Sequence, residues 1–163
     1  MGYPAISMLH MATAVTAMIA GLCVVLLTKG TRRHRRMRYV YVASMLALNV
    51  SSFFVFSLTG RFSPFHVASM FSLATVIAGF VPVYLRRPRG GWLRMHMELM
   101  VWSYVGLLAA AASEAAVRLP AAPFWWAVAA ATGTIILAGA AILAHNRPGL
   151  LARYARRRSA TTT

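Results

Sequence analysis

The sequence predicts an all-α integral membrane protein with five transmembrane helices, and three observations predict this class. The 163-residue chain is 60% hydrophobic and only 12% charged, whereas about a quarter of the residues of a soluble domain are charged. Five long apolar runs follow one another along the chain. Short basic segments separate these runs and hold most of the 17 Lys and Arg residues, against only two acidic residues.

Each apolar run is long enough to cross a bilayer as a helix, which takes about 20 mostly apolar residues. Backbone polar groups in lipid must bond within the protein, and no run alternates as a barrel strand does. We predict helices at about 3–27, 39–58, 65–85, 95–117 and 123–144 within a transmembrane domain of residues 1–145. The first four should form an up-down bundle. Residues 146–163 should be an unstructured basic tail, because they have too little apolar content to fold alone.

The basic residues predict the orientation of the chain. Fifteen of the 17 cations follow the first, third and fifth helices, and five crossings place these segments on one membrane face. Those before the fourth helix include Lys29, Arg32, Arg33, Arg35, Arg36, Arg38, Arg86, Arg87 and Arg89. The opposite face has only Arg61 and Arg118. The positive-inside rule makes the basic face cytoplasmic and the N-terminus external. The cations should contact anionic lipid headgroups rather than nucleic acid.

A weak internal repeat relates the first two helices to the next two. HMAT at 10–13 parallels HVAS at 66–69, and IAG at 19–21 parallels IAG at 77–79. A basic turn and a second histidine follow in each half. Helices one and three are diagonal in an up-down bundle, as are helices two and four. The repeat therefore predicts two histidine pairs, His10 with His66 in the outer leaflet and His34 with His96 near the inner surface.

Such pairs suit haem b, because two facing imidazoles can bind its iron axially inside a helical bundle. His34 can join His96 only if the second helix begins as early as Thr31. If that helix begins at Arg38, His34 is an ordinary solvated residue of the turn.

The residues predicted to lie in the outer leaflet also include a possible set of metal ligands. Glu114 lies near the outer end of the fourth helix, and with His10 and His66 it makes the two-histidine, one-carboxylate group that suits zinc or non-haem iron. A polar cluster of Asn49, Ser52 and Arg118 could support such a site. The alternative is a structural hydrogen-bond cluster with no cofactor, in which Glu114 simply pairs with Arg118 four residues on.

The chain lacks the motifs of soluble enzymes. It contains no GxxxxGK[ST], GxGxxG or HExxH, and without aspartate it has no Ser-His-Asp triad. The sequence favours a small redox or electron-transfer protein that holds haem b or a metal. Two alternatives stay open: a non-catalytic subunit of a larger membrane complex or homo-oligomer, and a metal-dependent membrane hydrolase.

Several segments resemble a family of uncharacterised bacterial integral membrane proteins labelled domain of unknown function 2306. They are His10, KGTRRHRR at 29–36, RFSPFH at 61–66, His96 and WSYVGLLAAAASE at 102–114. The resemblance covers about residues 8–117. The resemblance implies that three features are typical of the family: a Lys-Gly…His-Arg turn, a Phe-His pair and a late glutamate. In this chain they correspond to Lys29, Gly30, His34, Arg35, Phe65, His66 and Glu114. The family implies an architecture and no activity.

Overall fold

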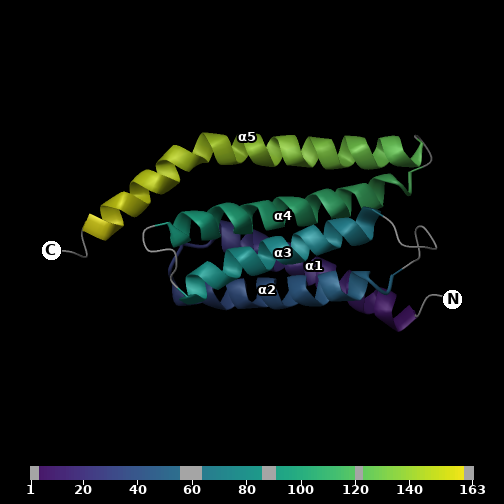
Figure 1. The fold of residues 1–163 in the computed structure, drawn as a ribbon, viewed down its shortest axis with the longest axis horizontal. Helices are drawn as coiled ribbons and strands as arrows, with labels where there is room; N and C mark the ends of the chain where they lie inside the picture. Colours follow the sequence, from purple (N-terminus) through teal and green to yellow (C-terminus); the bar gives the residue numbers. More distant parts are fainter. Residues whose placement is uncertain (1–3, 56–63, 86–90, 120–122, 160–163) are drawn as a thin grey trace. The chain divides into compact units, whose positions relative to one another are not determined.

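A computed structural model describes residues 4–55, 64–85, 91–119 and 123–159. These residues form the helices α1 (Pro4–Leu26), α2 (Arg32–Ser52), α3 (Pro64–Leu85), α4 (Trp92–Ala116) and α5 (Phe124–Ser159), as Figure 1 shows. No strand occurs among them. The predicted all-α class is confirmed. Stretches long and apolar enough to cross a membrane occur in α1, α3, α4 and α5, so four of the five predicted spans are found.

Helix α2 departs most from the sequence prediction, because it begins at Arg32 rather than Tyr39 and ends at Ser52. Thr31 caps its N-terminus by accepting a hydrogen bond from the backbone N–H of His34 at 3.2 Å. Such a cap fixes where a helix begins, whereas hydropathy reports only where it becomes apolar. Tight backbone turns over residues 53–55 end the helix. The remaining residues of the predicted end, 56–58, lie outside the described residues.

The turn between α1 and α2 is built by three successive residues. The Lys29 ammonium donates to the carbonyl oxygens of Val24 at 2.6 Å and Val25 at 2.7 Å, near the C-terminus of α1. Gly30 has φ +84°, a left-handed conformation that glycine adopts without steric penalty. Thr31 then caps α2. Lys29 and Gly30, which the family resemblance singles out, therefore have a structural role in this turn.

The chain forms two compact units, Met1–Leu107 and Leu108–Thr163. In the first unit α1 and α2 are antiparallel, since His10 near the start of α1 hydrogen-bonds Ser51 at the end of α2. Helices α3 and α4 are also antiparallel, since His96 near the start of α4 contacts Gly79 near the end of α3. This up-down order brings the starts of α2 and α4 to one end of the unit.

Two tyrosines and a glycine make close contacts between the helices in the core of the first unit. The Tyr41 hydroxyl hydrogen-bonds the Ser103 hydroxyl at 2.9 Å and so joins α2 to α4. The Tyr104 hydroxyl donates to the Met18 carbonyl oxygen of α1 at 3.2 Å. Gly21 of α1 lies so close to α4 that a Cβ atom there would stand 2.4 Å from the Tyr104 ring. Close helix packing of this kind depends on small residues in membrane proteins.

The second unit contains the end of α4 and the whole of α5. The buried Ser113 hydroxyl lies 2.7 Å from the Thr132 hydroxyl and joins the two helices. Helix α5 continues to Ser159, through residues expected to form an unstructured tail; Leu, Ala and Arg in this stretch are strong helix formers. The C-terminal part of α5 runs at an angle to the earlier part of the same helix (Figure 1).

Candidate functional site

His96 is buried in the second turn of α4, and α3 fixes its ring. Its Nδ1 atom lies 2.7 Å from the carbonyl oxygen of Gly79. A carbonyl oxygen only accepts hydrogen bonds, so Nδ1 carries the hydrogen and the lone pair of the neutral ring lies on Nε2. Metal-binding histidines commonly have this arrangement, with one ring nitrogen donating to a backbone carbonyl and the other facing the metal.

His34 lies in the first turn of α2, so α2 meets the condition for pairing His34 with His96. Burial lowers the pKa of His34, and Lys29, Arg38 and the ring of His96 lower it further, while the Val24 carbonyl opposes them. The Nδ1 atom of His34 is buried and has no hydrogen-bond partner in the part of the chain that the structure describes. Histidines from the two helices predicted to be diagonal, α2 and α4, therefore lie close enough to interact electrostatically.

The lowered pKa of His34 predicts a loss of stability on acidification. The unfolded chain takes up a proton near the ordinary histidine pKa of 6.5, whereas the folded chain does so only at lower pH. The stabilising contribution is therefore complete above the unfolded pKa and decreases as pH falls below it. Thermal unfolding in detergent at about pH 7.5 and about pH 5.5 measures this effect. His34→Gln should lose less stability over that interval, and an equal loss in both proteins would exclude His34 as the cause.

Arg38 lies one turn beyond His34 on the same face of α2. Its guanidinium carbon is 4.9 Å from the centroid of the Tyr39 ring and 5.6 Å from that of the Phe80 ring. Its charge acts on both His34 and His96. The Nε atom of Arg38 is buried and has no hydrogen-bond partner among the described residues. The other arginines of this block, Arg32, Arg33, Arg35 and Arg36, are exposed.

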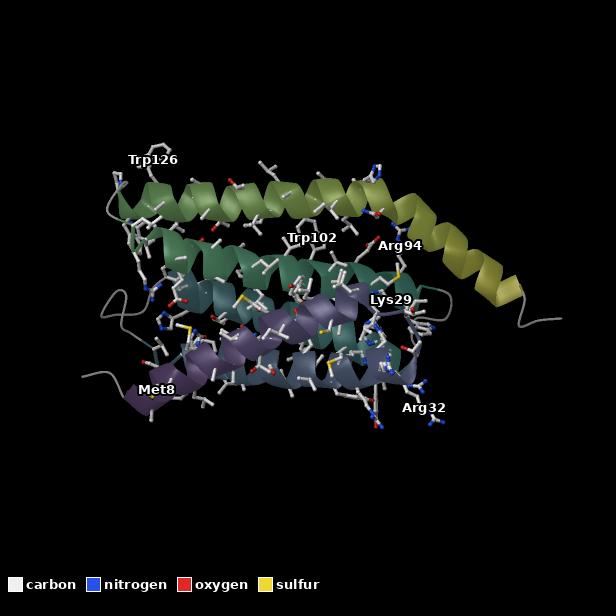
Figure 2. All side chains as sticks on the ribbon, turned by 180° about the vertical axis from the view of Figure 1, so that it is seen from behind. Met8, Lys29, Arg32, Arg94, Trp102 and Trp126 are labelled. Carbon is white, nitrogen blue, oxygen red and sulfur yellow. The ribbon has the colours of Figure 1, made fainter. Side chains whose placement is uncertain are left out.

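Basic residues gather at the end of the first unit that holds the His34–His96 pair. Lys29, Arg32 and Arg94 lie at this end, opposite Met8 (Figure 2). Arg86, Arg87 and Arg89, which the sequence assigns to the same face, lie outside the described residues, as does Arg61. The orientation of this end toward the cytoplasm stays a prediction.

The outer histidines both contact the C-terminal end of α2. His10 Nδ1 lies 3.1 Å from the Ser51 hydroxyl oxygen. That hydroxyl donates to the Leu48 carbonyl oxygen at 2.9 Å, so it accepts from His10. His66 is buried, and its ring centroid is 6.4 Å from that of Phe53. The structure thus brings His10 and His66 to the same end of one helix.

The residues proposed to complete an outer metal site make other contacts. Asn49 donates to the Met45 carbonyl oxygen and Ser52 to the Asn49 carbonyl oxygen, each at 2.7 Å within α2. Glu114 belongs to the second unit, and its carboxylate forms an ion pair with Arg118 at 2.8 Å. Within the described ranges, no three His, Cys, Asp or Glu side chains gather to hold a metal ion. The set of His10, His66 and Glu114 therefore gains no support.

Two features of the inner site were not predicted from the sequence. The carbonyl oxygen of Gly79 holds the ring of His96, but a backbone acceptor has no sequence signature of its own. Arg38 was grouped with the arginines that contact lipid headgroups, although four residues separate it from His34. That spacing places both side chains on one helix face, and it becomes informative once α2 is known to begin at Arg32.

A comparison with known families matches residues 7–147 to the family described as "Predicted membrane protein (DUF2306)". The chain belongs to this family. The match includes all four histidines of the two pairs and confirms the resemblance that the sequence motifs indicate. Together with the four apolar helices, it identifies a DUF2306 membrane protein. No curated protein and no solved structure matches the chain.

Proposed function

We propose that this DUF2306 protein binds haem b at its inner histidine pair and acts as a small electron-transfer component of the membrane. The observation that carries the proposal is the proximity of two neutral imidazoles on α2 and α4. The Gly79 carbonyl leaves the lone pair of His96 on Nε2, and burial with nearby positive charge keeps His34 neutral. Neutral imidazole is the form that binds iron.

The chain supplies several elements that a haem requires. His34 and His96 would hold the haem iron, and Gly79 would orient His96. The Nδ1 atom of His34 is buried and lacks a partner among the described residues. This is expected of a histidine that binds a further group. When bound, haem iron supplies one-electron redox chemistry, and its axial ligands and surrounding charges adjust the potential.

The charges around the inner pair favour haem over a bare metal ion. Lys29 and Arg38 act on the ring of His34, and their positive charge would repel a divalent cation at short range. Haem differs because the porphyrin offsets the iron charge and the propionates are negative. A two-histidine site beside two cations therefore suits haem better than zinc or ferrous ion.

The outer pair of His10 and His66 is proposed as a second haem site of the same chemistry. Its support is that both rings meet the end of α2, where the Ser51 hydroxyl accepts from His10 Nδ1. The positive-inside rule, applied to the basic end of the first unit, supports a cytoplasmic position for the inner pair. We therefore propose a bacterial cytoplasmic membrane in which the two haems lie at different depths.

A visible absorption spectrum of the purified protein tests the proposal. The chain should be produced in a bacterial membrane, purified in detergent and measured before and after reduction with dithionite. We expect a Soret band and sharp bands of reduced b-type haem. Pyridine haemochrome analysis should give one haem per chain for the inner pair alone and two if the outer pair is filled. A sample with no haem absorbance in repeated preparations would overturn the proposal.

One observation favours the second candidate, a non-catalytic subunit of a larger membrane complex. No residue in the most apolar window of α5 is buried, and Leu137 and Ile142 are among its exposed side chains. A partner subunit could cover this surface, as lipid could. A stoichiometric second polypeptide in a haem-free preparation would favour the subunit function.

A further inference from the structure

We propose that Arg38 binds an oxyanion, the carboxylate or phosphate of an amphiphile that reaches the basic end of the first unit. Arg38 is the principal group, because its planar guanidinium can bind carboxylate or phosphate through two parallel hydrogen bonds. His34 lies one turn before Arg38 on the same face of α2.

Both acidic side chains of the protein form ion pairs with arginines other than Arg38. The chain has 17 cationic residues and two acidic ones. Glu98 forms an ion pair with Arg94 at 3.0 Å, and Glu114 forms one with Arg118 at 2.8 Å. Each of these pairs lies four residues apart on one helix. An anion from outside the polypeptide is therefore the partner proposed for Arg38.

The contacts of Arg38 hold its charge in place without satisfying its hydrogen bonds. The rings of Tyr39 and Phe80 fix the guanidinium by cation–π contacts. Such contacts act through the ring faces and leave N–H groups available in the guanidinium plane. The buried Nε of Arg38 lacks a hydrogen-bond partner in the described part of the chain. Buried polar atoms in folded proteins are nearly always bonded, so an acceptor from a ligand completes this arrangement.

Two sources supply this chemistry in a membrane. A haem propionate supplies a carboxylate, and this case rests on the proposed haem function. An anionic phospholipid supplies a phosphate, and this case does not depend on haem. Arg38 is four residues from a proposed axial ligand and its charge acts on both inner rings, so either anion would lie beside the histidine pair.

The test compares Arg38→Gln with Arg36→Gln, which removes an exposed arginine of the same helix. Haem retention is measured by pyridine haemochrome, and binding of added phosphatidylglycerol to delipidated protein is measured by native mass spectrometry. Arg38→Gln should weaken one of these by at least about tenfold, as loss of a buried charge partner does. Arg36→Gln should match the wild type. Arg38→Lys keeps the charge without the guanidinium, so its binding should be intermediate.

The two readouts separate the two sources and the two proposals. A defect in haem retention alone identifies the propionate, and a defect in lipid binding identifies the phospholipid phosphate. Lipid binding that depends on Arg38 in a protein without haem would support the oxyanion site and overturn only the haem function. Equal haem and lipid binding in Arg38→Gln and Arg36→Gln would overturn the oxyanion site, even if haem is present. Size-exclusion chromatography establishes that each variant is folded, and Arg38→Lys serves if Arg38→Gln is not.

Discussion

Replacing His96 with alanine should abolish haem binding at the inner pair and remove the corresponding part of the Soret absorbance. The substitution removes the ring nitrogen with which α4 would hold the haem iron, and His34 alone would remain to hold it. The purified variant should contain one haem per chain fewer than the wild type. His145→Ala, which removes an exposed histidine of α5, should keep the wild-type spectrum.

A second variant separates iron binding from folding. The side-chain amide of His96→Asn can still donate to the Gly79 carbonyl oxygen, as Nδ1 of the histidine does at 2.7 Å, but it offers no Nε2 lone pair. We expect this variant to fold as the wild type does and still to lack the inner haem. Imidazole added to His96→Ala should restore part of the spectrum. Unchanged haem content in both variants would show that His96 is not a ligand.

Replacing Gly21 with alanine should destabilise the first unit by about 1–3 kcal/mol, the range for overpacking a well-packed interior. The new Cβ would stand 2.4 Å from two atoms of the Tyr104 ring and 3.0 Å from the Tyr41 ring. Neither tyrosine can move without disturbing its own hydrogen bond, to Met18 in one case and to Ser103 in the other. The apparent melting temperature in detergent should therefore fall.

The matched control for Gly21 is Gly106, which lies in α4 with no atom within 4 Å of the added Cβ. Gly106→Ala should not be destabilised, because alanine is intrinsically the better helix former by about 1 kcal/mol. Equal stability of Gly21→Ala and Gly106→Ala would mean that α1 and α4 do not pack as closely as the structure has them.

Much of the helical architecture follows from the length and composition of the apolar runs. The boundaries of α1, α3 and α4 agree with the sequence prediction to within a few residues, since hydropathy and helix nearly coincide there. In α2 the helix begins well before the apolar run does, because Thr31 caps the helix while arginines still occupy its first turns. The predicted pairing of His34 with His96 depended on this one boundary, the start of α2.

The inner site needed tertiary contacts that no residue pattern contains. Gly79 acts through its backbone, and Arg38 contacts the ring of Phe80 on another helix. Glu114 shows the reverse problem. A carboxylate in an apolar helix is a reasonable metal ligand on chemical grounds, but its neighbour Arg118 already forms an ion pair with it. Local spacing predicted that pair correctly, whereas grouping with histidines from distant helices requires knowledge of packing.

The early start of α2 has a consequence for how the protein is made. After Arg38 only the stretch from Tyr39 to Ser52 remains within the helix, which at 1.5 Å per residue extends about 21 Å. A bilayer core is about 30 Å thick, so this stretch is too short to partition from the translocon into lipid alone. The capped turn at Lys29, Gly30 and Thr31 joins α2 closely to the far more apolar α1. During synthesis, α2 is therefore expected to enter the membrane together with the preceding α1, as a hairpin.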